Sequence, residues 1–430
     1  MNLTRRALLL AGLVVLLGIA GQWIGPPWVG IWRYPAVLLA GLLALEALLC
    51  SRTAASAAVS LPDTAALGEP LSVRLAVAVQ SGRPTPVQLA PALPAEAPER
   101  VVPATVDCAP GAPGELAIRL TPTLLGRHPW PPVPARLRGR FGLAWWPRRI
   151  ATGAALNVAP GRLALASSGG GRVAGRHRGS ESGDGLELHG LREYQPGDPL
   201  RRVDWKASAR RGHPVVRELE QEARMSVVVA LDAGRTSGVR SGPLTRLGHY
   251  VNATARLAEL AAGSGDEVGL VVYADRPLAV LPPRTGVSAL ASIRRSLHSL
   301  RTQAADGNPL AAAVQVGRIT PRRSLVVLLS DLDDADQGGQ LARAVRLLGR
   351  RHLPLLGSLR DEDVEALQQR PARGGLDPYE SLAALVLAES VRGNRLALAR
   401  LGAQVVIAPP ARLEAALLRR YGLLRRRRAV

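Results

Sequence analysis

The sequence of 430 residues is poor in lysine, cysteine and aromatic side chains. Lys206 is the only lysine among 55 basic residues, and it follows a tryptophan rather than a glycine. A Walker A loop needs a Gly-Lys pair to hold nucleotide phosphates, so this scarcity excludes a P-loop ATPase. Cys50 and Cys108 are the only cysteines, and they give no sign of a disulfide framework. Aromatic residues make up 3%, so leucine, valine and alanine must fill the cores.

Recognisable catalytic motifs are also missing. The sequence has no HExxH, no GxSxG and no cysteine–histidine cluster with zinc spacing, and its seven histidines are scattered. These absences predict a protein that is not an enzyme. The formal charge of +21 fits a nucleic acid, an anionic lipid or an acidic protein as partner. It fits equally well a GC-rich genome in which arginine replaces lysine, so a nucleic-acid-binding membrane protein stays an alternative that we do not favour.

Two apolar runs near the start of the chain are long enough to cross a membrane. Residues 7–24 form a run of 18 residues, about 27 Å as a helix, which is just enough for a bilayer core. Residues 34–50 form a second run that only Glu46 interrupts, and tryptophan and tyrosine flank the break. We therefore expect a transmembrane hairpin over residues 1–52.

The basic residues around these runs predict an orientation. Arg5 and Arg6 precede the first run and Arg52 follows the second, so the positive-inside rule places both ends in the cytoplasm. We expect a multi-pass protein of the inner membrane, with the lipid bilayer as a partner and the bulk of the chain in the cytoplasm. The alternative is a signal peptide cleaved after Ala20. A spanning second run would still leave the bulk of the chain cytoplasmic.

The region after the hairpin has the pattern of strands. Apolar and polar residues alternate along 71–79 and 115–120, as in half-buried strands, and proline and glycine are dense between them. We predict a β-rich, sandwich-like domain over residues 57–160. Residues 161–190 have the glycine- and serine-rich composition of a flexible linker.

From Met225 onward, short apolar runs alternate with helical stretches. This pattern predicts a mainly parallel sheet covered on both faces, a Rossmann-like α/β domain over residues 222–421. The strand-like runs are 225–234, 266–276, 323–334, 352–361 and 403–409. Asp232 and Asp331 end two of these strands and could meet, because ligand sites in such sheets lie at the carboxyl ends of strands. The alternative is that each aspartate only caps a turn or helix.

The last residues, 422–430, are predicted to form a basic tail. Four consecutive arginines at 425–428 follow a pair of leucines. Near an anionic leaflet this tail could bind lipid, at about 1 kcal/mol per basic residue. A solvated end is the alternative.

A dense polar segment at residues 191–221, called here the signature block, separates the linker from the α/β domain. Gly197 and Asp198 indicate a turn, and Asp204 followed by WKASARR and Gly212 indicates a capped short helix. We expect its arginine–carboxylate pairs to lock it against the neighbouring sheet. One side of it could instead be a docking surface. We expect Trp205 to be more important to folding or docking than Trp146, which follows Trp145 in a predicted loop bounded by proline. The candidate partner-binding or structural residues are Arg192, Glu193, Tyr194, Gly197, Asp198, Arg201, Asp204, Trp205, Lys206 and Arg210.

The signature block also resembles a known family. REYQPGD at 192–198, followed by RRVDWKASAR at 201–210, is similar to the signature of the bacterial family called domain of unknown function 58. The resemblance implies two membrane helices, a β-rich region and then a domain like the von Willebrand factor type A fold, an order that matches nearly the whole chain. It also implies a non-enzymatic scaffold or adaptor that works with a MoxR-type AAA+ ATPase, in complex assembly or envelope maintenance.

The type A fold implies a cation site at the carboxyl edge of the sheet. Its Asp-x-Ser-x-Ser motif, with a later threonine and aspartate, holds Mg²⁺ through oxygen ligands. Here Asp232 and Thr236 match the first motif and Asp331 fits the last acid, but Gly234 has no oxygen to offer. The resemblance therefore implies a degenerate site, with Mg²⁺ as its cation, on Asp232, Thr236 and Asp331.

Two alternatives concern this site. Arg235, inside the motif, could place a positive charge where the cation would bind. A divalent-cation-dependent hydrolase could instead use Asp232 and Asp331. Such phosphoryl-transfer folds usually have a second acid near the first and a lysine after the strands, and the chain has Gly234 and no lysine after 206.

Overall fold

The computed structural model describes residues 2–26, 28–161, 182–183, 187–200, 203–220, 224–333, 335–371 and 374–427. The chain divides into two compact units, Met1–Ala164 and Leu165–Val430.

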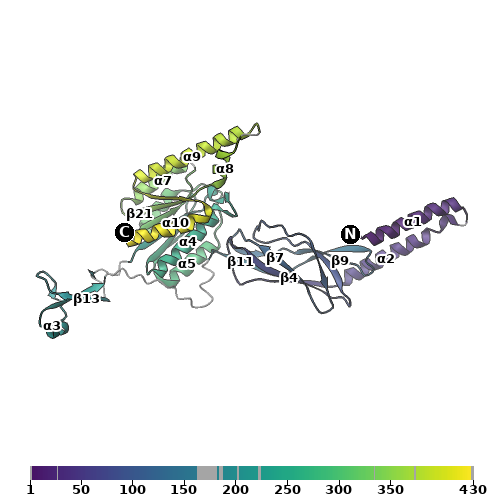
Figure 1. The fold of residues 1–430 in the computed structure, drawn as a ribbon, viewed down its shortest axis with the longest axis horizontal. Helices are drawn as coiled ribbons and strands as arrows, with labels where there is room; N and C mark the ends of the chain where they lie inside the picture. Colours follow the sequence, from purple (N-terminus) through teal and green to yellow (C-terminus); the bar gives the residue numbers. More distant parts are fainter. Residues whose placement is uncertain are drawn as a thin grey trace. The chain divides into compact units, whose positions relative to one another are not determined.

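The first unit begins with two long apolar helices, α1 (Arg5–Ile24) and α2 (Arg33–Arg52), joined through the short helix η1 (Trp28–Gly30). They are drawn in purple in Figure 1. The segments Arg5–Ile24 and Trp28–Arg52 have mean hydropathies of 2.2 and 1.8, and only 11% of each is buried. Both are therefore long and apolar enough to cross a membrane, at the positions that the two apolar runs predict.

The rest of the first unit is β-rich. Its strands are β1 (Asn2–Leu3), β2 (Ala55–Ser60), β3 (Ala65–Ala66), β4 (Leu71–Val79), β5 (Thr85–Leu89), β6 (Ala104–Cys108), β7 (Gly114–Leu120), β8 (Gly126–Pro129), β9 (Val133–Arg138), β10 (Ala144–Ile150) and β11 (Ala155–Ala159). They form sheets of order β1-β10-β9-β5-β6, β2-β4-β7 and β3-β11-β8. β4 buries Val73, Leu75 and Val77 and exposes alternate residues, which is the expected pattern. Trp146, expected in a loop, lies within β10.

Within the second unit, the signature block and the strand residues just before it form a small antiparallel sheet. β12 (Ser182–Gly183), β14 (Val215–Glu220) and β13 (Glu187–Glu193) form a three-stranded antiparallel sheet in that order, with the helix α3 (Trp205–Arg211) between β13 and β14. β13 begins inside the predicted linker 161–190, most of which lies outside the described residues. The strand therefore begins earlier than the composition indicated.

A six-stranded sheet of order β19-β18-β15-β20-β21-β22 organises the α/β region. Its strands are β15 (Ser226–Asp232), β18 (Glu267–Tyr273), β19 (Pro277–Arg284), β20 (Leu325–Leu329), β21 (Leu353–Leu359) and β22 (Gln404–Ala408). All neighbours are parallel except β18 and β19. Every residue of β15 and β20 is buried, because helices cover both faces.

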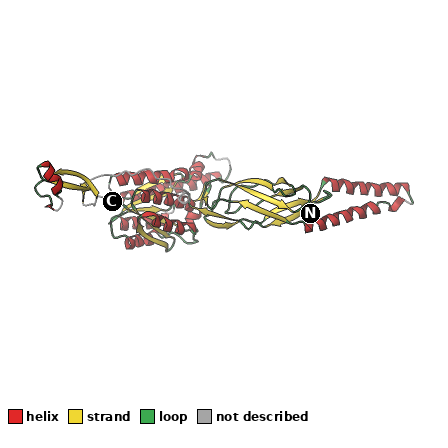
Figure 2. Cartoon of the chain, turned by 90° about the horizontal axis from the view of Figure 1, so that it is seen from below, coloured by secondary structure: helices red, strands yellow, loops and turns green. Residues whose placement is uncertain are grey.

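Three helices cover each face of this sheet. α4 (Arg246–Gly263), α5 (Gly286–His298) and α10 (Pro410–Arg426) pack on one face, and α6 (Pro309–Ile319), α7 (Ala335–Leu348) and α9 (Asp377–Arg400) pack on the other. α8 (Glu362–Gln369) packs on α9. The layers are visible in Figures 1 and 2. The core between the sheet and the second set of helices includes Val228, Val326 and Leu356.

The end of the chain corrects the predicted boundary between the α/β domain and a basic tail at 422–430. α10 continues to Arg426, and Leu424 is 4% exposed. Arg425 donates to a carboxylate oxygen of Asp266 at 3.0 Å, so its charge is neutralised within the fold. The helix continues because its apolar residues are spaced to reach the sheet, which the arginine run obscured.

Candidate functional site

The strand order reverses between β15 and β20, and this is where ligands bind in doubly wound sheets. The parallel register pairs Leu231 with Leu329, so Asp232 and the following Ser330 and Asp331 lie at the same carboxyl edge. The Ser330 hydroxyl donates to Oδ2 of Asp232 at 2.7 Å. The sequence thus placed the two aspartates correctly at one edge.

Asp232 is closed off from water at this edge. Its side chain accepts a hydrogen bond from the backbone N–H of Gly234 at 2.8 Å as well as the one from Ser330, and the residue is 1% exposed. Burial raises the pKa of Asp232 to about 6, while these two hydrogen bonds act in the opposite direction. Asp331 and Asp306 add to the rise because their charges repel a second carboxylate.

Asp331 belongs to a second cluster, built around a buried arginine. Arg246, the first residue of α4, is 5% exposed. Its guanidinium lies 3.3 Å from Oδ2 of Asp331, 2.6 Å from Oδ2 of Asp333 and 3.4 Å from Oδ2 of Asp361. The three carboxylates come from the ends of β20 and β21, so the arginine ties adjacent strands to the start of α4.

Tyr250 completes the cluster one helical turn later. Its hydroxyl donates to Oδ1 of Asp331 at 2.6 Å and accepts from the backbone N–H of Leu359 at 3.4 Å. Burial raises the pKa of Tyr250 well above its usual value, and the nearby Asp331 charge raises it further. Burial alone would lower the pKa of Arg246, but the carboxylates of Asp331 and Asp333 more than offset this and raise it. Arg246 is therefore a permanent cation.

The residues predicted to hold Mg²⁺ do not fit a divalent ion as the structure arranges them. Both oxygens of Asp331 are engaged by Tyr250 and Arg246, and Arg246 supplies the positive charge next to this carboxylate. The Thr236 hydroxyl is buried and has no hydrogen-bond partner in the described part of the chain. Within those same residues, no group of three or more histidine, cysteine or acidic side chains is arranged to hold a metal.

Packing around Gly234 is a further reason why these residues do not form the predicted Mg²⁺ site. A Cβ atom at this position would lie 2.7 Å from the backbone nitrogen of Gly307, and one at Gly307 would lie 2.5 Å from Oδ2 of Asp232. The serine of the adhesion motif therefore cannot be accommodated at position 234. Arg235 does not take the place of the cation either, because it pairs with Asp306 at 2.9 Å in an exposed position.

A cavity of about 480 Å³ opens beside the arginine cluster, at the carboxyl ends of β20, β21 and β22. Arg246, Asp333 and Asp361 line one part of it. α9 contributes apolar residues, among them Leu387 and Val391, together with Arg392 and Arg395. The cavity thus joins a charged wall to an apolar one, which is the composition expected of a binding site.

The signature block is held together by its own charged pairs. Arg192 forms a bidentate pair with Asp198, at 2.6 and 2.7 Å, across the turn at Gly197. Gly197 has φ +110°, a conformation that favours glycine. This pairing lowers the pKa of Asp198 to about 2. Asp198 also accepts the backbone N–H of Gln195 at 2.8 Å, which closes the turn.

The helix of the block is capped as predicted. Asp204 accepts the backbone N–H groups of Lys206 and Ala207 at 3.1 and 3.0 Å, and its second oxygen lies 3.1 Å from Nε of Arg217. These hydrogen bonds, with the charge of Arg217, lower the pKa of Asp204. Gly212 ends the helix in the left-handed conformation, with φ 73°. These two pairs connect elements of the block itself. Arg201 and Arg202 lie outside the described residues, so contact of the block with the neighbouring sheet stays a prediction.

The other candidate residues of the block are mostly at its surface. Trp205 is 68% exposed, and Glu193, Lys206 and Arg210 are also exposed. Tyr194 is half-buried, and Arg201 lies outside the described residues. Because Trp205 is mostly exposed, we expect it to act in docking rather than in folding, and its greater importance relative to Trp146 stays a prediction.

Sequence reasoning did not identify Arg246, Tyr250, Asp333 or Asp361. A signal was present, because Arg246, Tyr250 and Leu257 have the spacing of one helical face and that face is otherwise apolar. A cation in the first turn of a helix also opposes the helix dipole. Both features indicate a buried arginine that needs acidic partners.

The fold and this edge define a doubly wound α/β domain of the Rossmann-like class that carries a charged cluster at its switch point. Residues 190–374 match the family described as "Protein of unknown function DUF58". The chain therefore carries a domain of this family, as the residues of the signature block indicated.

Similar proteins are known from mycobacteria. Uncharacterized proteins of Mycobacterium tuberculosis and Mycobacterium bovis are 28% identical to this chain over 163 residues, which is 37% of this chain and 51% of theirs. The match thus spans about half the length of these relatives.

Two solved structures match parts of the chain at low identity. The conserved hypothetical protein BatB from Bacteroides thetaiotaomicron matches 47% of this chain and 99% of its own, with 14% identity and a TM-score of 0.31. The CARDB domain of a Pyrococcus furiosus protein, solved in complex with di-metal ions, matches 25% of this chain and 88% of its own, with 14% identity and a TM-score of 0.17.

Proposed function

We propose that the protein is a non-enzymatic interaction protein, anchored in the inner membrane by α1 and α2, with the bulk of the chain in the cytoplasm. It would act as an adaptor that works with a MoxR-type AAA+ ATPase in the assembly of protein complexes or in envelope maintenance. The ATPase enters through the family resemblance alone. The membrane anchoring is supported by two helices of sufficient length and hydropathy.

The observation that carries the non-enzymatic part is the position of Arg246. A cation-dependent hydrolase would need carboxylate oxygens free to bind its ion. Here each oxygen of Asp232 and Asp331 already accepts a hydrogen bond or lies in an ion pair. The permanent charge of Arg246 stabilises a fixed architecture at the edge where hydrolysis would otherwise take place.

The cavity beside Arg246 is the docking site in this proposal. Arg246 is balanced by Asp331, Asp333 and Asp361, and Arg360 pairs with Glu365 at 3.5 Å. The exposed Arg392 and Arg395 add positive charge beside the apolar Leu387 and Val391. The complementary occupant is a segment of a partner protein that presents an apolar side chain next to a carboxylate.

Affinity purification of the full-length protein from native membranes, with and without ATP, tests this function. We expect mass spectrometry to identify an AAA+ protein in the wild-type sample and to find at least tenfold less of it with Arg392→Glu/Arg395→Glu. The matched control is Arg400→Glu, on the same helix but outside the residues that line the cavity.

The possible outcomes separate the parts of the proposal. If no AAA+ protein co-purifies under either condition, the adaptor role is wrong. If it co-purifies equally with the double variant, the cavity is not the docking site. Turnover of phosphoesters with Mg²⁺ that Asp232→Ala abolishes would replace the proposal with the hydrolase alternative.

A further inference from the structure

The turn between β9 and β10 is fastened to both apolar helices. Thr4, the N-cap of α1, donates its hydroxyl to the carbonyl oxygen of Gly142 at 2.7 Å. From α2, the carboxylate of Glu46 accepts the backbone N–H groups of Phe141 at 2.8 Å and Ala144 at 3.1 Å. Each helix therefore binds the same turn by a polar side chain.

Glu46 explains why this attachment is firm. The residue is 0% exposed, and a third N–H, from Leu143, points to it at 3.3 Å. A Cβ atom at Gly139 would lie 2.0 Å from the Glu46 side chain, so the turn closes directly over the carboxylate. Because Glu46 lies in the last two turns of α2, the β9–β10 turn is held at the level where the apolar helices end. The residue that interrupts the second apolar run is the group that docks the β-rich region.

The strand pair that carries this turn is strongly basic. Residues 133–150 contain five arginines and no acidic residue. The antiparallel register places Arg138 opposite Trp145 and Arg136 opposite Pro147, and paired residues lie on the same face of a sheet. Arg136 is exposed and the buried residues of β9 alternate with it, so this face points away from the core.

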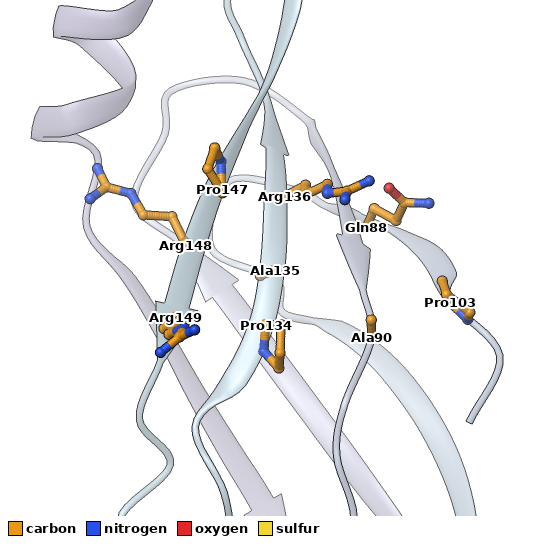
Figure 3. Close-up of a pocket in the computed structure, with 9 residues that line it drawn as sticks. All are labelled: Gln88, Ala90, Pro103, Pro134, Ala135, Arg136, Pro147, Arg148 and Arg149. Carbon is orange, nitrogen blue, oxygen red and sulfur yellow. The ribbon is translucent and has the colours of Figure 1, made fainter. Parts of the chain in front are cut away.

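A cavity of about 390 Å³ lies on this surface, lined mainly by residues of β9 and β10. Figure 3 shows the side chains that line it. Arg136 extends toward Gln88, and Arg149 lies beside Pro134. Arg148 points instead toward α2, where it donates to the carbonyl oxygens of Cys50 at 2.5 Å and Ser51 at 2.9 Å. Arg148 thus holds the end of α2 at one side of the cavity, and Arg136 and Arg149 also line it.

We propose that Arg136, Arg138, Arg140 and Arg149, called here the basic hairpin, bind the headgroups of anionic phospholipids in the bilayer that α1 and α2 cross. The inference rests on the proposed membrane anchoring. It names a ligand for the β9–β10 strand pair, which is separate from the cavity beside Arg246. Phosphate diesters match arginine because the guanidinium presents a fork of N–H donors. The turn also exposes Phe141, at 40%, which suits the boundary between headgroups and acyl chains.

Native mass spectrometry of the full-length protein in neutral detergent tests the proposal. The protein is titrated with phosphatidylglycerol and, separately, with phosphatidylcholine, and bound lipids are counted. We expect phosphatidylglycerol to bind at least tenfold more tightly, and Arg136→Gln/Arg138→Gln/Arg140→Gln to remove this preference. Arg74→Gln/Arg119→Gln/Arg127→Gln, which changes three exposed arginines on β4, β7 and β8, is the control and should retain it.

Other results would overturn either the lipid site at the basic hairpin or the proposed membrane anchoring. A triple variant that keeps the preference, or a control that loses it, would show that the basic hairpin is not the site. Inorganic phosphate that displaces the lipid at equal concentration would identify a site for free anions. A protein that does not fractionate with membranes would contradict the proposed anchoring. The lipid titration is done in detergent, so its result does not depend on membrane anchoring and the two failures can be told apart.

Discussion

The signature block and the carboxyl edge of the α/β sheet both depend on pairs of arginine and aspartate, but the pairs differ in range and burial. Arg192 and Asp198 are six residues apart, with side chains 36% and 16% exposed. Arg246 and Asp333 are 87 residues apart, with side chains 6% and 19% exposed. The first pair closes one turn, whereas the second belongs to a cluster that joins α4 to the ends of β20 and β21.

The difference shows what each pair can do for the protein. Water reaches the partly exposed guanidinium of Arg192 and screens its pair with Asp198, so this pair contributes little to stability and mainly fixes a local shape. The buried cluster cannot lose one member without leaving charges in a dry environment. We therefore expect changes at the carboxyl edge to affect the whole domain and changes in the block to stay local.

The largest effect is expected for Arg246→Met. It leaves Asp331, Asp333 and Asp361 without their cation and should lower the free energy of unfolding by about 3–5 kcal/mol. Hydrogen exchange of peptides from β15 and β20 measures this in the α/β domain alone. Arg235→Met, which removes an exposed pair, should cost under about 1 kcal/mol. Equal losses in the two variants would remove the distinction between the regions.

A smaller effect of opposite sign is expected for Asp232→Asn. The pKa of Asp232 is about 6 in the folded protein against an ordinary 3.8, so the folded state binds the proton more tightly. The free energy of unfolding therefore falls as pH rises from about 4 to 6 and stays lower above that. Asparagine removes this cost and should raise the free energy of unfolding at pH 7.5 by about 3 kcal/mol.

The pH profile distinguishes this explanation from simple repacking. Exchange of the β15 peptides between pH 4 and pH 7.5, corrected for the intrinsic rate, should show a flatter stability curve in Asp232→Asn than in the wild type. Glu362→Gln, which changes an exposed carboxylate in α8, should leave the curve of the wild type unchanged. A variant at Asp232 with the same pH dependence as the wild type would show that another group titrates.

The smallest effect is expected in the signature block. Asp204→Ala removes the cap of α3 and should destabilise this helix by about 1 kcal/mol, visible as faster exchange in residues 205–211 and unchanged exchange in β15. Trp205→Ala should leave both rates unchanged, because the side chain is mostly exposed. Slower folding or faster exchange throughout the α/β domain in either variant would mean that the block braces the sheet after all.

Much of the fold could be predicted from local pattern. The five strand-like runs of the α/β region match β15, β18, β20, β21 and β22, because continuous apolar runs identify buried parallel strands. β19 was missed because Pro277, Pro282 and Pro283 obscure a strand that only an edge position allows. The cap of α3 and the turn at Gly197 could also be predicted, since their hydrogen bonds are local.

The site was harder to predict because its contacts are distant in sequence. Strand topology brings Asp232 and Asp331 to one edge, and the alternation of strands and helices in the sequence predicted this. The partners of Asp331 come from α4 and from the end of β21, and nothing local to Asp331 indicates them. The contacts of Glu46 could not be predicted for the same reason. Its hydrogen-bond donors are backbone N–H groups about 95 residues away, and every residue except proline has such a group.

The cluster around Asp266 has a mechanical consequence. Asp266 is 0% exposed and accepts the backbone N–H of Met225 at 3.1 Å, together with the Tyr421 hydroxyl and Arg425. Met225 lies five residues after the end of β14 and immediately before β15, so tension applied to the signature block would travel along the backbone to this point. The contacts of α10 with Asp266 would then resist the removal of β15 from the sheet.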